Sequence, residues 1–338
     1  MHERMTEPQQ FRALSALVGN TPLLELTMEY HGERRVVYAK AESYNLSGSI
    51  KDRVAYYMLK KAYQTGEIHP GDCIAEATSG NTGIAFSAMG AALGHPVVIY
   101  MPDWMSMERR NIILSYGAEV RLVSAEEGGF LGSIAMTEKL AEQGGVYLPR
   151  QFSNEDNVET HYETTGAEIA AQLAAIGKTA DAVVAGVGTG GTVMGIGRRL
   201  RTVNPDCAVF PLEPLNSPTL STGYKVGKHR IQGISDEFIP PILKLPETTG
   251  IVSVDDVDSI RMAQMLSRQL GLGVGISSGA NLLGCLLAGD RIGGEKTIVT
   301  VFADDNKKYL STDYCEEFPQ TEDSITSQLK LLSVRSIR

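Results

Sequence analysis

One lysine in this chain has a local sequence that could support covalent chemistry. Lys51 lies in the segment 47–53, which reads SGSIKDR, and the pattern predicts a helix over residues 49–63. A lysine amine attacks an aldehyde only after it loses its proton, and the positive end of a helix dipole favours that loss. Asp52 and Arg53 follow and could orient the turn. The same short segment is also compatible with a surface lysine on a helix.

Two further segments join an expected strand to an expected helix through glycines and hydroxyl residues. Residues 78–83 read TSGNTG, after the expected strand 73–77, and residues 188–192 read GTGGT, after the apolar run 182–187. Backbone amides at a helix N-terminus bind anions. The first loop therefore suits an amino-acid carboxylate and the second suits a phosphate. An ordinary capped helix remains an alternative for the first loop.

The second loop has a competing interpretation as a dinucleotide site. Residues 186–191 read GVGTGG and approximate the glycine pattern of such sites. However, the segment is not in the first βαβ unit of the chain, and the nearest acid, Glu213, is followed by Pro214. A single phosphate fits better. A lysine for an aldehyde, a carboxylate loop and a phosphate loop together indicate a pyridoxal-phosphate enzyme.

Composition narrows the class of protein. The 338 residues carry a net charge of −9, which disfavours nucleic acid or an anionic membrane as the main partner. The four cysteines are widely spaced, without the spacing of metal ligands, so no metal is expected. The N-terminus has no apolar signal core, and no stretch is long enough to span a membrane. We expect a cytoplasmic protein.

Expected strands and helices alternate along almost the whole chain. Short apolar runs bounded by Gly and Pro are separated by amphipathic helices, which indicates parallel sheets covered on both faces. The fold class is therefore α/β. One helix is expected over 157–173, and the polar C-terminal tail is expected to be weakly helical over 325–332 and loosely docked.

Ordered motifs along the chain resemble those of the cysteine synthase and cystathionine β-synthase family of pyridoxal-phosphate enzymes, and O-acetylserine sulfhydrylases in particular. Besides the segments above they are LVGNTPL at 17–23, MPD at 101–103, SMERR at 106–110, QFSN at 151–154, ETTG at 163–166 and YLST at 309–312. The resemblance implies fold type II, like the tryptophan synthase β subunit, with two lobes that each hold a mostly parallel sheet flanked by helices. It implies a smaller mobile lobe over 46–155, a larger lobe formed by 1–45 and 156–320, and a tail over 321–338.

The resemblance also implies roles for individual residues. Lys51 would carry the cofactor and take the substrate α-proton. Other cofactor contacts would come from Asn81, Gly188, Thr189, Gly190, Gly191, Thr192 and Ser277. Substrate contacts would come from Thr78, Ser79, Asn81, Thr82, Gln151 and Gly233.

Two acidic positions depart from the family pattern. Counting back from Tyr309, the hydroxyl residue that faces the pyridine nitrogen in the family falls on Asp305, with Asp304 beside it. A carboxylate there would keep the nitrogen protonated and strengthen the electron sink, which favours side racemisation or transamination. Asp236, followed by Glu237, stands where sulfide-using synthases have small residues, and it could repel sulfide or activate a nucleophile. In both places the alternative is a solvated loop.

The implied reaction is β-replacement on an L-serine derivative such as O-acetylserine. Sulfide or a thiol would add to an aminoacrylate, reached through an external aldimine, to give L-cysteine. The alternative is replacement or elimination that starts from L-cysteine, releases hydrogen sulfide and forms serine, lanthionine or cystathionine. The resemblance further implies a homodimer and possible docking of a serine acetyltransferase.

Overall fold

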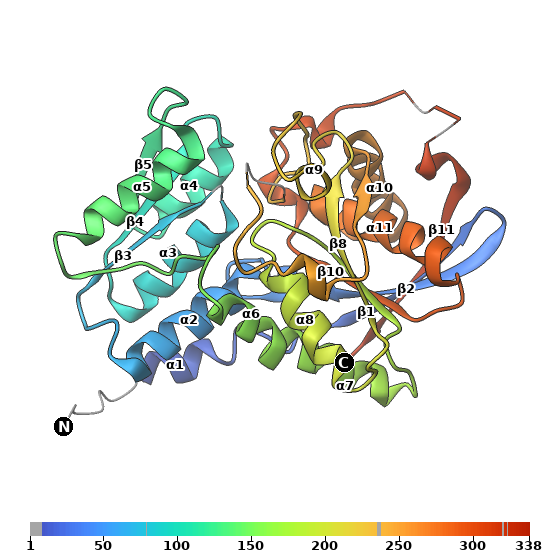
Figure 1. The fold of residues 1–338 in the computed structure, drawn as a ribbon, viewed down its shortest axis with the longest axis horizontal. Coiled ribbons are helices and arrows are strands. Elements are labelled where there is room, and N and C mark those ends of the chain that lie inside the picture. Colours follow the sequence, from blue (N-terminus) through green and yellow to red (C-terminus); the bar gives the residue numbers. More distant parts are fainter. Residues whose placement is uncertain (1–8, 79, 235–237, 320, 323) are drawn as a thin grey trace. The chain divides into compact units, whose positions relative to one another are not determined.

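The computed structural model describes residues 9–78, 80–234, 238–319, 321–322 and 324–338 (Figure 1). The chain divides into two compact units. The first runs to Gly19 and resumes over Asn45–Asp156, and the second comprises Asn20–Tyr44 and Asn157–Arg338. Residues 9–19 thus group with the first unit, whereas the resemblance implied that residues 1–45 belong to the larger lobe.

The first unit is built on a parallel sheet with the strand order β5-β4-β3-β6. Its strands are β3 (Cys73–Ala77), β4 (Val97–Pro102), β5 (Glu119–Val123) and β6 (Val146–Tyr147). Its helices are α1 (Gln9–Leu14), α2 (Lys51–Thr65), α3 (Asn81–Leu93), α4 (Met107–Ser115) and α5 (Gly129–Ala141), and α6 (Asp156–Thr160) begins at its end. Strand β3 has the bounds that the sequence predicts, 73–77.

Alternation along strand β4 explains why helices cover both faces of this sheet. Ile99 packs in a cluster with Met58 of α2 and Phe86 of α3, whereas Val98 and Tyr100 face a second cluster to which α5 contributes. Successive side chains of a strand point to opposite faces, so a continuous apolar run needs cover on both. Thr78, Gly80 and the start of α3 lie at the carboxyl end of β3.

The second unit has a mixed sheet with the strand order β11-β1-β2-β10-β7-β8-β9. Its strands are β1 (Leu23–Tyr30), β2 (Glu33–Ala41), β7 (Ala182–Gly186), β8 (Ala208–Pro214), β9 (Val252–Val254), β10 (Ile298–Phe302) and β11 (Leu329–Ile337). Its helices are α7 (Gly166–Ala175), α8 (Gly191–Arg201), α9 (Thr219–Thr222), α10 (Asp256–Leu270) and α11 (Ile276–Ile292). Its shorter helical turns are η1 (Glu42–Tyr44), the π-helical η2 (His161–Thr165), η3 (Leu245–Glu247), η4 (Asn306–Lys308), η5 (Asp313–Cys315) and η6 (Ile325–Gln328). Strands β2, β10, β7, β8 and β9 pair in parallel.

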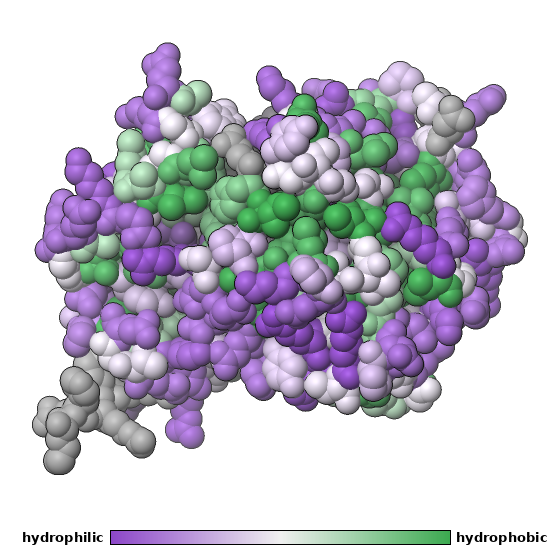
Figure 2. Space-filling view, in the orientation of Figure 1, coloured by the Kyte–Doolittle hydropathy of each residue, from purple (hydrophilic) through white to green (hydrophobic). Residues whose placement is uncertain are grey.

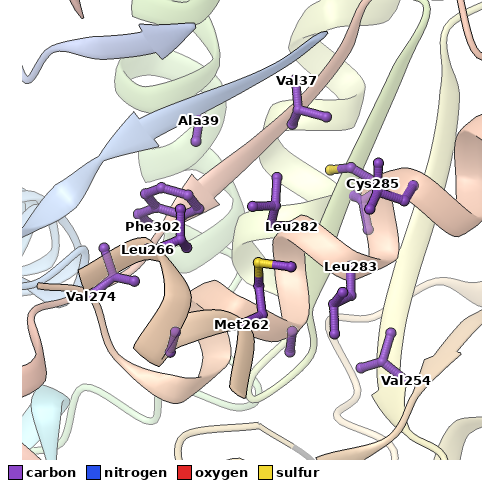
Figure 3. Packing of buried hydrophobic residues seen from close by; sticks show 14 of the residues in the cluster. Val37, Ala39, Val254, Met262, Leu266, Val274, Leu282, Leu283, Cys285 and Phe302 are labelled. Carbon is purple, nitrogen blue, oxygen red and sulfur yellow. The ribbon is translucent and has the colours of Figure 1, made fainter. Parts of the chain in front are cut away.

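Helices α10 and α11 pack on one face of this sheet, where they bury the main hydrophobic cluster (Figure 3). Leu282 and Leu283 of α11 lie in it with Phe302 of β10 and Met262 of α10. Phe210 and Leu212 of β8 lie in this cluster, whereas Val209 points to the other face. Helix α8 covers that face, where a Cβ at Gly197 would lie only 2.7 Å from a methyl of Val209. The two helical layers hold the carboxyl ends of β7 and β10 in place.

The C-terminal segment corrects the sequence-based expectation of a weakly helical, loosely docked tail. Beyond the short turn η6, residues Leu329–Ile337 form β11, which pairs antiparallel with β1 at the edge of the sheet. Leu331, paired with Met28, is buried, while Leu332 is exposed. This alternation fits a half-buried strand, and its nearest pairing partners lie about 300 residues earlier in the chain, so no local pattern reveals them.

Hydrophilic residues spread across both units on the face drawn in Figure 2, with apolar residues gathered in smaller areas. Among the described residues, no helix combines the length and apolar character needed to span a membrane.

Candidate active site

Lys51 is the first residue of α2 and is partly buried. The buried carboxylate of Asp52 organises the turn before it, accepting bonds from the amide of Ser47 at 2.9 Å, the hydroxyl of Ser47 at 2.6 Å and the amide of Ser49 at 3.3 Å. Gly48 has a φ of 84°, which favours glycine. The structure therefore confirms the expectation that Asp52 orients this turn.

The 78–83 loop lies where β3 ends and α3 begins. Thr78 is buried, and its hydroxyl oxygen accepts the Gly80 amide at 3.1 Å. A Cβ at Gly80 would lie 2.3 Å from Cδ of Arg109, whose side chain is buried. Only glycine fits so close to that side chain. The predicted loop is thus built at a helix N-terminus beside an arginine that sequence reasoning had not assigned to the site.

Gln151 joins this loop from about 70 positions further along the chain. Its Nε2 donates to the carbonyl of Ala77 at 3.0 Å, and its Oε1 accepts the hydroxyl of Thr82 at 2.7 Å. Both Gln151 and Thr82 are buried. The structure therefore brings together Thr78, Asn81, Thr82 and Gln151, which the sequence predicted as substrate contacts.

The carboxyl group of Glu76 is buried on β3, two residues before Thr78. Its two oxygens accept the amides of Ala77 at 3.0 Å and Gln151 at 3.3 Å. Burial raises the pKa of Glu76 to about 8, and the two amides, the charge of Lys51 and that of Arg150 act in the opposite direction. Sequence reasoning missed Glu76, although an acid at the end of an otherwise apolar strand, CIAEA, was a usable signal.

The 188–192 loop leads into the N-terminus of α8, where main-chain amides have no partner within the helix. Gly190 has a φ of 87°, and a Cβ at Gly191 would lie 2.2 Å from Oδ1 of Asn157. Asn157 supports the loop by donating to the hydroxyl of Thr189 at 2.9 Å. Small residues, hydroxyls and a helix N-terminus, with no acid among residues 188–192, fit a phosphate group.

Residues from a neighbouring helical turn contact this loop and help to hold it in place. Oγ1 of Thr192 is 3.3 Å from Nε2 of His161, whose Nδ1 is 2.9 Å from Oγ1 of Thr165. His161 and Thr165 bound the π-helical turn η2, which interrupts the single helix expected over 157–173. A π turn shifts the helical register by one residue, an irregularity that often marks functional sites.

Gly233 also approaches the phosphate loop, since a Cβ on Gly188 would lie 2.5 Å from the Gly233 carbonyl.

Glu213 is the acid that would bind a ribose if the second loop were a dinucleotide site. Its carboxylate is buried and already accepts several hydrogen bonds within the protein. It accepts the Leu220 amide at 2.7 Å, the Ser253 hydroxyl at 3.1 Å and a bond from the Ser221 hydroxyl. A carboxylate used in this way is not available for a ribose, which favours the single-phosphate interpretation.

The paired acids after β10 differ in environment. Asp304 is fully buried, accepts the Tyr309 hydroxyl at 2.5 Å and lies against Gly275, just before Ser277 in α11. The carboxylate of Asp305 caps the following turn η4: one oxygen accepts the Lys307 amide at 3.1 Å, and the other is 3.5 Å from Nζ of Lys307. The role predicted for Asp305 stays a prediction, and Asp304 is the more enclosed of the two.

Two predicted substrate residues, Ser79 and Asp236, lie outside the residues that the structure describes, as does Glu237. Asn157 and His161 were missed because helical residues of these types carry no pattern that marks them as loop supports.

Comparison with known proteins agrees with this geometry. Residues 14–304 match the family described as pyridoxal-phosphate dependent enzyme. The probable cysteine synthase of Bacillus subtilis (strain 168) is 43% identical over 298 residues, which cover 88% of this chain and 95% of that protein.

Two solved structures are also similar. A hydrogen sulfide-producing enzyme from Fusobacterium nucleatum is 57% identical, with a TM-score of 0.95 and coverage of 98% of this chain and 99% of that one. A cysteine synthase from Entamoeba histolytica is 32% identical, with a TM-score of 0.82 and coverage of 96% of each chain. On these motifs, this fold and these relatives, the chain belongs to the cysteine synthase family of pyridoxal-phosphate dependent enzymes.

Proposed function

We propose that this protein catalyses β-replacement on an L-serine derivative such as O-acetylserine, with sulfide or a thiol as nucleophile and L-cysteine as product. The main support is a pair of loops at helix N-termini whose amides and hydroxyls suit anions, one beside Gln151 and one beside Asn157, in a chain that also carries Lys51 at the start of α2. Pyridoxal phosphate, when bound, supplies an electron sink for the carbanion at the substrate Cα.

Separate groups of residues would bind the cofactor, its phosphate and the substrate carboxylate. Lys51 would carry the cofactor and move the α-proton. It directly follows a turn that the hydrogen bonds of Asp52 hold in place. Amides and hydroxyls of 188–192 would hold the phosphate, with Gly233 and Ser277 close to the rest of the cofactor. Thr78, Ser79, Asn81, Thr82 and Gln151 would hold the substrate carboxylate through hydroxyl, amide and main-chain donors.

A second candidate starts from L-cysteine and releases hydrogen sulfide. It is favoured by one observation: the Fusobacterium nucleatum enzyme, described as hydrogen sulfide-producing, is 57% identical over nearly the whole chain, a higher identity than that of the Bacillus subtilis cysteine synthase. In that reaction the thiol of cysteine would be the leaving group. Asp236 would then be the residue to activate water or a second thiol.

Product analysis separates the two reactions. The purified holoenzyme is incubated with O-acetylserine plus sulfide, and separately with L-cysteine alone, and amino acids and sulfide are quantified. The proposal predicts rapid formation of L-cysteine in the first mixture and little sulfide in the second. Fast sulfide release from L-cysteine with a weak response to O-acetylserine would replace the first candidate with the second. No reaction in either mixture would contradict both.

We also propose that the protein acts in the cytoplasm as a homodimer and that a serine acetyltransferase is a possible partner. Family resemblance supports the homodimer and the partner, and the four widely spaced cysteines support the cytoplasm.

A further inference from the structure

We infer that Glu76 is a positioning residue for substrate binding: it fixes Gln151 against the 78–83 loop and thereby sets the affinity for the amino-acid carboxylate. The inference rests on the proposed function, because it takes that loop to be the carboxylate site. Neither the motifs nor the comparisons assign a role to Glu76.

The first support is the way in which one carboxyl group joins two distant stretches of chain. One oxygen of Glu76 accepts the amide of Ala77, at the end of the strand that leads into the loop, at 3.0 Å. The other accepts the amide of Gln151 at 3.3 Å. Glu76 is only 5% exposed. Burying a carboxyl group is costly unless it is well hydrogen-bonded, so an apolar residue would serve this strand better if packing were its only task.

The second support is that the Gln151 side chain repeats the same connection. Its Nε2 donates to the Ala77 carbonyl at 3.0 Å, while its Oε1 accepts the Thr82 hydroxyl at 2.7 Å. Through Glu76 and Gln151, the end of β3, the start of α3 and the segment at 151 form one hydrogen-bonded unit. A shift of the Gln151 main chain would therefore move Thr82, which is one of the predicted carboxylate contacts.

The third support is the backbone just before Gln151. Arg150 has a φ of 52°, a left-handed conformation that few non-glycine residues adopt. The Arg150 carbonyl accepts the amides of Ser153 at 3.0 Å and Asn154 at 2.9 Å, so the chain turns sharply there. The bond from the Gln151 amide to Glu76 secures the turn on its buried side.

The test compares two ligands that differ only in the carboxylate. The holoenzyme is titrated with L-alanine, which has no leaving group at Cβ, and with L-alaninamide, while the visible absorbance of the cofactor is followed. For Glu76→Ala we expect the dissociation constant of L-alanine to rise about tenfold, the equivalent of one hydrogen bond, and that of L-alaninamide to stay unchanged. Glu76→Gln retains one acceptor oxygen and should recover part of the loss.

Glu119→Gln is the matched control, because Glu119 lies on β5 of the same sheet with its side chain 55% exposed, and its affinities should equal those of the wild type. Unchanged L-alanine affinity in Glu76→Ala, or an equal loss for both ligands, would overturn the inference. If Glu76→Ala does not fold, Glu76→Gln carries the same comparison. A wild-type holoenzyme that binds both ligands equally would instead refute the carboxylate loop itself, and with it both proposals.

Discussion

At the scale of single residues, the difference between Asp304 and Asp305 has chemical consequences. Adjacent residues of a chain point in different directions, so only one of them can be enclosed beside Gly275 while the other caps the following turn. Because Asp304 is the fully buried one, we expect that it, rather than Asp305, keeps the pyridine nitrogen of the cofactor protonated.

The two acids can be separated by the same substitution at neighbouring positions. Asp304→Asn should shift the visible spectrum of the holoenzyme and reduce side racemisation or transamination, because a neutral amide does not stabilise a protonated nitrogen. Asp305→Asn should change neither, since its carboxylate caps η4 locally. Absorbance spectra and product ratios check both. A spectral change confined to Asp305→Asn would restore the original assignment.

The residues that sequence reasoning identified and those that it missed differ in how they are encoded. Lys51, Asn81 and the 188–192 loop stand in contiguous motifs, so strand, loop and helix can be predicted from adjacent letters. Glu76 acts through Gln151, 75 positions away, and Asn157 through Thr189, 32 positions away. Such pairs exist only after the chain has folded.

At the scale of elements, the C-terminal strand shows the same limit. The interior strands were predictable, since apolar runs flanked by Gly and Pro leave few alternatives. Strand β11 reads LKLLSVRSI, and its pairing with β1 depends on contacts that no window of sequence contains. The helix expected over 157–173 likewise resolves into α6, the π turn η2 and α7, and His161 of η2 lies 3.3 Å from the hydroxyl of Thr192, 31 positions further along the chain.

The pairing of β11 with β1 predicts a difference between adjacent leucines. Leu331→Ala should lower the free energy of unfolding by about 2 kcal/mol, because it removes a buried side chain. Leu332→Ala should change it by less than about 0.5 kcal/mol, since Leu332 is 45% exposed. Urea unfolding followed by circular dichroism measures both. Equal effects would contradict the strand register.

At the scale of the whole molecule, Glu76 makes stability depend on pH. Its pKa is raised from an ordinary value of 4.5 to about 8, so between these values the folded protein retains a proton that the unfolded chain releases. The free energy of unfolding should therefore fall as pH rises through this interval, and fall less steeply in Glu76→Gln. Urea unfolding at about pH 5 and about pH 8 tests this. Parallel slopes in wild type and variant would show that Glu76 is already ionised at neutral pH.

Two compact units of α/β architecture each carry a loop with glycines and hydroxyl residues at the carboxyl end of a parallel strand, as the proposed chemistry requires. The central claim is that Lys51 carries the cofactor. The most direct measurement reduces the cofactor–lysine bond of the holoenzyme with borohydride and locates the modified residue by peptide mass spectrometry. We expect modification of Lys51, and no modification in Lys51→Ala. Modification of a different lysine, or a protein that takes up no pyridoxal phosphate, would contradict it.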